Sequence, residues 1–503
     1  MADRKVVVVG AGLGGIAVAA RLAYMGWIVE VFEKNEGPGG RCDRLVRDGF
    51  RWDTGPTLLL MPHVLAQTFA EMGERMSDYL DLVRAEPNYC IFFEDGFQIR
   101  MRSDLLAMRE QIERIEPGGF EGFLQYVGQG YRLYRLAMER FVSRQFDGFW
   151  DYFGLRNLPL LFQLKALRNH YAETGRFVRD PRLRAALTFQ DMYLGLSPFE
   201  APATYALLAA AELTEGIWFP KGGMYRVVEA LATIARKHGV RFYYNTPVRQ
   251  IVIDQGRATG VILEEGSFVP ADVVVVNADL PYAYRALLPM DPEARRLQRM
   301  RYTCSAITFY WGLDHGLPGL AAHNVFLSGD YKASLDQIFH AHALPDRPSF
   351  YLHIPSRLDP GIAPPDGEAI MVLVPVGHLE EGSAQPVDRW VEQARQAVAG
   401  RLADVLGVRD LLSRIRCEVV YTPETWRSRY NLEKGAAFGL GHQFDQVGYL
   451  RPANRHPRYH NLYFVGASTH PGTGLPMVLL SARLVAERIA RDMGTRAPGR
   501  TWD

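Results

Sequence analysis

The sequence has few cysteines, no zinc-binding pattern and no excess of either charge. Its 503 residues include Cys42, Cys90, Cys304 and Cys417, with no CxxC pair and no histidine spacing nearby that suits zinc. We therefore expect reduced thiols and no metal site. A formal net charge of +1 argues against a protein that follows nucleic-acid phosphates. No nucleic-acid-binding module is visible, so we expect no nucleic-acid partner.

Long hydrophobic runs and internal repeats are also missing. No stretch approaches the ~18 uncharged apolar residues of a membrane-spanning helix. An expected strand begins almost at the first residue, which leaves no room for a signal peptide, so we expect a cytoplasmic protein. The length suits two or more domains, and an apolar content of 48% can fill their cores.

The first part of the chain carries a nucleotide-binding pattern. Four valines at 6–9 predict a buried strand, followed by Gly10, Gly12 and Gly15 and then an apolar helix. Such glycines allow a tight turn, close approach of a pyrophosphate and close packing of the helix, whose amino terminus attracts phosphate. A glycine-rich turn can also serve packing alone. However, Glu33 ends a second strand, at 28–32, about twenty residues later, where an acid binds an adenosine ribose and repels a 2'-phosphate.

The residues after Glu33 distinguish a flavin cofactor from a nicotinamide cofactor. Gly39, Gly40 and Arg41 resemble the second glycine pair and arginine of the flavoprotein superfamily that includes amine oxidases and carotenoid desaturases. In that superfamily the arginine lies along the FAD pyrophosphate, and the segment that matches 53–57 runs beside the isoalloxazine ring. A planar guanidinium with forked donors suits a diphosphate.

The end of the chain narrows the resemblance. Residues 461–477 are similar to the carboxy-terminal signature of bacterial-type phytoene desaturases and their carotenoid-desaturase relatives, although Ser468 stands where that family usually has glycine. Blocks at 189–225 and 435–452 also resemble family blocks, in the family order. The resemblance runs from Val6 to Ala490 and is weaker between 280 and 414.

This resemblance implies an α/β fold, with a Rossmann-like FAD-binding domain and an inserted, discontinuous α+β substrate domain. We expect the first domain at 1–75, 215–285 and 415–503, and the second at 76–214 and 286–414. Expected helices include 103–144, 225–238, 387–403 and 477–493. Expected strands include 240–244, one beginning at Val248, 250–253, 260–264, 273–276, 306–311 and 462–465.

The implied activity is desaturation of a long isoprenoid hydrocarbon, phytoene or a related C40 or C30 carotenoid precursor, with FAD taking two electrons and a quinone or oxygen as final acceptor. A hydrocarbon offers no group to ionise or coordinate, so positioning and a dry cavity matter more than charged catalytic groups. The expected cofactor-binding residues are Gly10, Ala11, Gly12, Gly14, Gly15, Glu33, Lys34, Gly40, Arg41, Gly55, Pro56, Thr57, Val248, Gly466, Gly474, Pro476 and Met477.

Three side chains are candidates for a general base. His470 could accept a proton from a carbocation-like intermediate, but Pro471 follows it and no carboxylate is evident to orient it, so a structural histidine is an equal alternative. Asp191 and Glu212 are candidates by position alone. The turn at 472–474 precedes a helix whose terminal amides would stabilise negative charge on the reduced flavin.

Residues 146–177 mix aromatic and basic side chains, as segments at a membrane interface do. This segment predicts peripheral contact with a membrane; the alternative is a set of helices packed on the domain core. The aromatic and aliphatic members are Phe149, Trp150, Tyr152, Phe153, Leu155, Leu158, Leu160, Leu161, Phe162 and Leu164, and the basic ones are Arg156, Lys165, Arg168 and Arg176.

Other functions remain open. Members of the same family could isomerise, saturate or oxygenate carotenoids, and the amino-terminal motif alone would also suit an amine oxidase. A non-catalytic flavin or carotenoid carrier is a further alternative, although such a protein has no need to keep every glycine of the cofactor cradle together with Glu33 and Arg41.

Overall fold

A parallel sheet forms the core of the first domain in the computed structural model, which describes residues 4–146, 148–155, 157–380, 382 and 384–495. Its strand order is β19-β13-β1-β2-β9. The strands are β1 (Lys5–Val9), β2 (Ile28–Phe32), β9 (Arg241–Tyr243), β13 (Val273–Val276) and β19 (Leu462–Phe464). Strands buried on both faces are apolar throughout, which explains the valine runs of β1 and β13. The expected Rossmann-like class is confirmed.

Helices cover one face of this sheet and a small antiparallel sheet covers the other. Val6 and Val8 face α1, while Val7 and Val9 pack against the small sheet, whose strand order is β10-β11-β12. The helix α16 begins two residues before the expected start, since proline suits the first helical turn. The elements are α1 (Leu13–Tyr24), α10 (Tyr225–Lys237), α16 (Leu475–Asp492), β10 (Val248–Asp254), β11 (Arg257–Leu263) and β12 (Phe268–Pro270).

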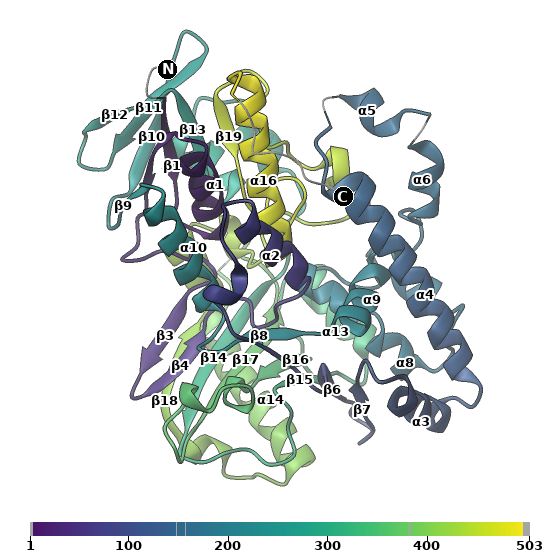
Figure 1. The fold of residues 1–503 in the computed structure, drawn as a ribbon. Helices are drawn as coiled ribbons and strands as arrows, with labels where there is room; N and C mark the ends of the chain where they lie inside the picture. Colours follow the sequence, from purple (N-terminus) through teal and green to yellow (C-terminus); the bar gives the residue numbers. More distant parts are fainter. Residues whose placement is uncertain (1–3, 147, 156, 381, 383, 496–503) are drawn as a thin grey trace.

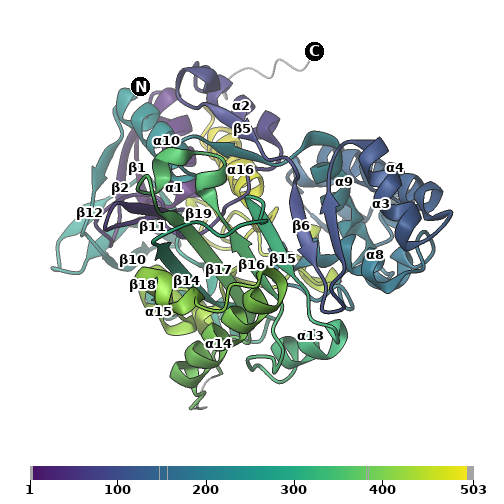
Figure 2. The ribbon, with the colours of Figure 1, turned by 90° about the horizontal axis from the view of Figure 1, so that it is seen from below.

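The second domain contains a seven-stranded sheet in the order β18-β14-β17-β16-β15-β6-β7. Figure 2 shows it between the parallel sheet and the helical layer. β18 pairs with β14, so this strand lies in the second sheet, although the expected boundary at 415 put it in the first domain. Its elements are β6 (Tyr89–Phe92), β7 (Gln98–Met101), β14 (Ser305–Leu313), β15 (His323–Phe326), β16 (Phe350–His353), β17 (Glu368–Val376), β18 (Ile415–Tyr421) and the covering helix α14 (Val387–Leu406).

A layer of helices completes the second domain, at the right of Figure 1. Its main pair is α4 against α9, and the expected helical segment at 103–144 is confirmed. The helices are α3 (Leu105–Ile115), α4 (Gly119–Ala137), α5 (Phe149–Phe153), α6 (Leu158–Gln163), α7 (His170–Thr174), α8 (Pro181–Ala186) and α9 (Ala206–Glu215). Arg156 and the side chains of Leu158, Leu161 and Phe162, all in the expected membrane segment, lie outside the described part of the chain.

Shorter elements connect these layers. They are α2 (Pro62–Ala70), β3 (Arg44–Arg47), β4 (Phe50–Asp53), β5 (Leu82–Arg84), β8 (Trp218–Pro220), α11 (Leu280–Tyr282), α12 (Glu293–Gln298), α13 (Tyr331–Phe339) and α15 (Pro423–Tyr430). Within the described ranges, no helix has the length and apolar character needed to cross a bilayer. The four cysteines are buried and unpaired with one another.

Candidate functional site

A cavity of about 790 Å³ lies between the parallel sheet, the second sheet and the helical layer. Its walls come from segments far apart in the sequence, including the turns after β1 and β2, the residues after β13, and the turn before α16. The carboxyl ends of β1, β2, β13 and β19 meet at the same edge of the parallel sheet, where ligands bind in open α/β folds.

The glycine-rich turn after β1 leaves no room for side chains. A Cβ on Gly15 would lie 2.1 Å from the carbonyl oxygen of Gly10, so the third glycine brings α1 against the strand. A Cβ on Gly12 would lie 2.6 Å from Oδ1 of Asn277. Asn277 follows β13 and lines the cavity; its Nδ2 donates to the carbonyl of Val465 at 2.9 Å. Its buried Oδ1 has no partner among the described residues and can accept from a ligand.

Glu33 connects the end of β2 to this turn. Its Oε2 accepts a hydrogen bond from the backbone N–H of Ala11 at 2.7 Å, and its Oε1 accepts from Asn35 N–H at 2.9 Å. Burial raises the pKa of the carboxyl group above its usual value, and the two backbone bonds oppose that rise. The carboxylate still lines the cavity, where its remaining lone pairs can accept from hydroxyl groups.

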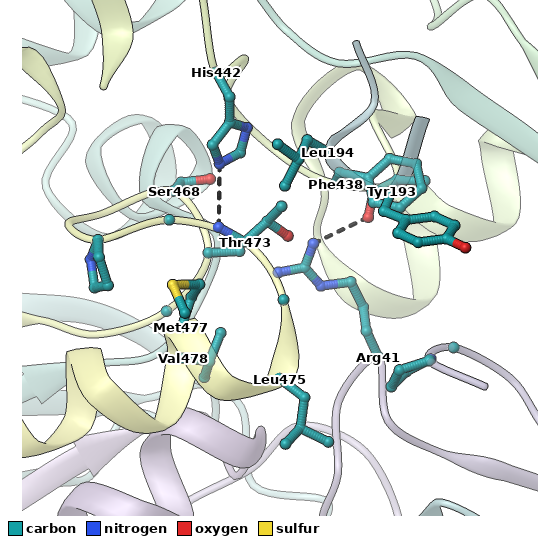
Figure 3. A pocket seen from close by; sticks show the side chains of 18 of the residues that line it. Arg41, Tyr193, Leu194, Phe438, His442, Ser468, Thr473, Leu475, Met477 and Val478 are labelled. Carbon is teal, nitrogen blue, oxygen red and sulfur yellow. Dashed lines mark hydrogen bonds between the residues drawn. The ribbon is translucent and has the colours of Figure 1, made fainter. Parts of the chain in front are cut away.

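Arg41 lines the cavity and extends toward the segment of Phe438, as Figure 3 shows, where its Nη1 donates to the carbonyl of Ala437 at 3.0 Å. The nearby carboxyl of Asp279 accepts from the hydroxyl of Ser468 at 2.6 Å, and burial raises its pKa. Ser468 also accepts from the backbone N–H of Leu440 at 3.3 Å. The serine in place of the family glycine therefore connects three segments of the wall.

Two helices begin at the cavity. The N-cap residues of α1 and α16 are Gly12 and Gly474, and in the described structure neither helix has a side-chain cap. Uncapped amides at a helix amino terminus carry partial positive charge and bind anions. Before α16, the backbone N–H of Thr473 donates to Nε2 of His442 at 3.1 Å (Figure 3).

The structure brings most of the predicted cofactor residues together. Ala11 and Gly15 are buried behind the wall, where they support Glu33 and α1 respectively. The predicted residues that line the cavity are Gly10, Gly12, Gly14, Glu33, Lys34, Gly40, Arg41, Gly55, Pro56, Thr57, Val248, Gly466, Gly474, Pro476 and Met477.

The three candidate bases occupy different places. His470 lines the cavity, but its Nε2 bonds to the carbonyl of Arg144 at 3.0 Å, and burial lowers its pKa to about 4, so it is a weak base at neutral pH. Asp191 is fully buried and contacts Nδ1 of His170 at 2.7 Å. Glu212 is fully buried beside Gln190, and burial raises its pKa well above the usual value. Within the described residues, neither carboxyl lines the cavity.

The part of the cavity beneath the second sheet is lined largely by apolar side chains, and its wall includes a series of hydrogen-bonded polar side chains. Thr57 Oγ1 lies 2.8 Å from the hydroxyl of Tyr351, which lies 2.7 Å from Nδ1 of His323. His323 is buried against His353, with ring centroids 4.7 Å apart. Apolar lining residues in this part are Leu58, Leu60, Phe141, Val142, Leu207, Leu208, Leu327, Leu335, Ile338, Phe350, Met371 and Leu373.

A family model described as flavin containing amine oxidoreductase matches residues 13–490. The chain belongs to this family. The protein is therefore an oxidoreductase with a flavin cofactor. It is similar to the zeta-carotene-forming phytoene desaturase of Myxococcus xanthus, with 49% identity over 492 residues that cover 97% of this chain and 94% of that protein. The resemblance found in the sequence is confirmed.

Other similar proteins are more distant. The 4,4'-diapolycopene oxygenase of Methylomonas sp is 34% identical over 494 residues, covering 98% of this chain and 99% of the oxygenase. A solved oxidoreductase from Methanosarcina mazei has a TM-score of 0.64 at 19% identity, covering 96% of this chain and all of that one. The structural likeness supports the family fold.

Sequence reasoning missed several residues at the cavity of this family member. Asn277 and Asp279 follow a strand that was predicted, and the rule that ligands bind beyond the carboxyl ends of parallel strands could have found them. Tyr351 and His442 carry no local pattern, since their partners Thr57 and Thr473 are 294 and 31 residues away.

Proposed function

We propose that this flavoprotein is an FAD-dependent desaturase that introduces carbon–carbon double bonds into phytoene or a related C40 or C30 precursor in carotenoid biosynthesis. The observation that carries the proposal is that one cavity has a polar part and an apolar part. One part offers Glu33, Arg41 and two uncapped helix termini, and the other is walled by aliphatic and aromatic side chains. The desaturase relative supports the same reaction.

The cofactor that fits the polar part is FAD rather than a smaller flavin. Glu33 suits the hydroxyls of an adenosine ribose, and the amino terminus of α1 with Arg41 suits a diphosphate. Val248, which lines the same end, would border the adenine. The distant end of the polar part, at Gly474, Pro476 and Met477, would face the flavin ring.

FAD, when bound, supplies a two-electron acceptor for a hydride from an allylic carbon of the substrate. The apolar side chains align the hydrocarbon and exclude water. The amino-terminal amides of α16 favour negative charge at the edge of the cavity where they begin. His470 offers little basicity at neutral pH, so we assign no general base.

Substrate entry from a membrane surface completes the proposal. Leu167, Phe444 and Leu450 line the cavity and are also exposed, which marks its mouth. The helix α5 lies beside this mouth, because Tyr152 stacks on Tyr449 with ring centroids 5.9 Å apart.

The surface beside the mouth combines apolar and basic side chains. Trp150 and Leu155 are 79% and 90% exposed. Lys165, Arg168 and Arg176 all contact the single carboxylate of Glu173, which leaves a local excess of positive charge. Aromatic side chains and cations at one surface suit an anionic bilayer. We propose a cytoplasmic protein that binds the membrane peripherally and passes its electrons to a quinone or to oxygen.

Anaerobic reduction tests the reaction. Purified protein that carries FAD should lose its flavin absorbance when mixed with liposomes that contain phytoene, and should keep it with liposomes that contain none. Product analysis by mass then counts the double bonds gained. The oxygenase relative supports one alternative, oxygenation, which would give products that contain oxygen only when oxygen is present. Retained absorbance with phytoene liposomes would contradict desaturation of this substrate.

A further inference from the structure

Two loops of the second domain bring together three side chains that can bind a metal. His342 follows α13, and His378 and Glu380 follow β17. The potential ligand atoms all lie within 4.8 Å of one another. None of the three residues belongs to the lining of the flavin cavity.

Their spacing is that of ligands around a shared ion. Oε1 of Glu380 lies 3.5 Å from Nε2 of His342 and 3.3 Å from Nδ1 of His378. A charge-assisted hydrogen bond between such atoms would be about 2.7–2.9 Å long, so these contacts are too long for strong direct pairing. Two ligands with bonds of about 2.1 Å to one tetrahedral ion are roughly 3.4 Å apart. The two separations from the Glu380 oxygen agree with that value, and the two imidazole nitrogens lie within 4.8 Å of each other.

One side chain fixes all three loop positions. The Nε2 amide of Gln385 donates to the carbonyls of His342 at 2.8 Å and His378 at 3.2 Å. Its Oε1 accepts from the backbone N–H of Glu380 at 3.0 Å. Because a single carboxamide holds the backbones of the three residues, their arrangement does not depend on chance contact between surface side chains.

The backbone at His342 is also constrained. Its φ of 48° lies in the left-handed region, which an L-residue adopts only when its surroundings require it. Gly377 provides the space, since a Cβ there would lie 2.2 Å from the carbonyl carbon of His342. The loop after α13 is thereby pressed against the end of β17.

The cluster is open to solvent on one side. The side chain of His378 is buried, while those of His342 and Glu380 are 29% and 39% exposed, so an ion can enter. Burial is the main cause that lowers the pKa values of both imidazoles, and the nearby ammonium of Lys434 lowers them further; this positive charge also opposes the binding of a cation.

We propose that His342, His378 and Glu380 bind one zinc ion or a similar divalent transition metal, with a fourth position left to water. Two imidazole nitrogens and one carboxylate oxygen form a ligand set that zinc accepts. His378 would bind the ion through Nδ1. In this structure that atom lies 3.2 Å from the carbonyl oxygen of Leu379. The ion would join the loop after α13 to the loop after β17.

Equilibrium dialysis of the full-length, flavin-loaded protein against zinc, after treatment with a chelator, tests the site. We expect one zinc per chain. The variants Glu380→Gln and His378→Ala should weaken binding at least about a hundredfold, and Gln385→Leu about 10–100-fold, as loss of an outer partner does. Lys434→Met should strengthen zinc binding, because it removes a nearby positive charge. The matched control is His340→Ala, because His340 lies in the same loop and contacts Glu200 instead.

Flavin content and the unfolding temperature without zinc check that each variant is folded. If His378→Ala does not fold, the test rests on Glu380→Gln. Zinc should raise the unfolding temperature of the wild type and of His340→Ala, but not that of Glu380→Gln. Absence of stoichiometric zinc in the wild type, or equal affinity in wild type and Glu380→Gln, would overturn the proposal.

Discussion

Nε2 of His442 accepts a hydrogen bond from the backbone N–H of Thr473 at 3.1 Å. Because Nε2 is the acceptor, the proton of the neutral imidazole lies on Nδ1. Burial and the charge of Arg451 lower the pKa of His442 well below its usual value, which keeps the ring neutral. This bond fixes the turn that leads into α16 at the proposed flavin site.

The variant His442→Phe should therefore destabilise the protein, since it leaves a buried N–H without an acceptor. We expect a loss of about 1–3 kcal/mol and a shifted flavin absorption spectrum, measured by thermal unfolding and visible spectroscopy. His460→Phe, at an exposed histidine, should stay within about 0.5 kcal/mol of the wild type. Equal effects of the two substitutions would refute the role of the bond.

The variant Gly15→Ala should lower stability and flavin content together. Its Cβ would lie 2.1 Å from the carbonyl oxygen of Gly10, so α1 must move away from β1. Overpacking of this kind costs about 1–3 kcal/mol. Gly400→Ala, in α14 with nothing within 4 Å of the added Cβ, should instead stabilise by about 1 kcal/mol. A Gly15→Ala protein with normal unfolding temperature and flavin ratio would contradict this account.

The variant Glu33→Gln should weaken FAD binding about ten- to a hundredfold, because a hydrogen bond to a charged acceptor contributes about 1.5–3 kcal/mol. Quenching of flavin fluorescence gives the dissociation constant. The control is Glu36→Gln, three residues away, where the carboxylate is exposed and pairs with Arg429. The ribose assignment fails if both variants bind FAD as the wild type does.

Acid should destabilise the second domain through buried His353, whose pKa burial lowers from 6.5 to about 4. The unfolded chain takes up a proton near pH 6.5 and the folded one only near pH 4. Stability is therefore full above pH 6.5 and is lost as the pH falls toward 4. From pH 7 to pH 5 the loss is about 2 kcal/mol.

His353→Gln removes this contribution, so the stability gap between wild type and variant should shrink by that amount at pH 5. Asp53, whose pKa burial raises to about 6, has the opposite dependence, but it is present in both proteins and cancels. Denaturant unfolding at the two pH values is the measurement. A gap that does not change with pH would show that His353 is not neutral in the folded protein.

Charged substitutions beside the cavity mouth should abolish membrane binding. We expect Trp150→Glu with Leu155→Glu to prevent sedimentation with anionic liposomes, since both side chains are exposed at that surface. Met290→Glu is the matched control, because Met290 is 94% exposed and lies after α11, in a different part of the chain. Unchanged sedimentation of the double variant would exclude this surface as the membrane contact.

Local patterns predicted the elements that depend on nearby residues. β1, α1 and β2 follow from a valine run, spaced glycines and an acid, all within about thirty residues. Long-range pairing was not predictable in this way: β18 joins β14 across a hundred residues, and nothing in its own sequence indicates the second sheet. The same holds for His342 and His378, because they lie in two different loops and the linear sequence shows no spacing of cysteines or histidines that suits a metal.

Burial also changed the interpretation of side chains that were chosen by position. Asp191 and Glu212 lie in segments that resemble the family, but they face the interior of the helical layer. A sequence window locates such a residue on a helix and does not tell which neighbour covers it.

The parallel sheet has a consequence for the order of events during synthesis. β19 and α16 are made more than 180 residues after β13 and more than 440 residues after α1 (276 to 462 and 24 to 475), yet β19 pairs with β13 and α16 packs against α1. A nascent chain that stops before residue 462 lacks this strand, this helix and the turn between them, and with these one wall of the proposed flavin site. If flavin binds at the proposed site, tight loading of the cofactor must therefore wait until α16 has been made, and truncation before residue 462 would release chains without flavin.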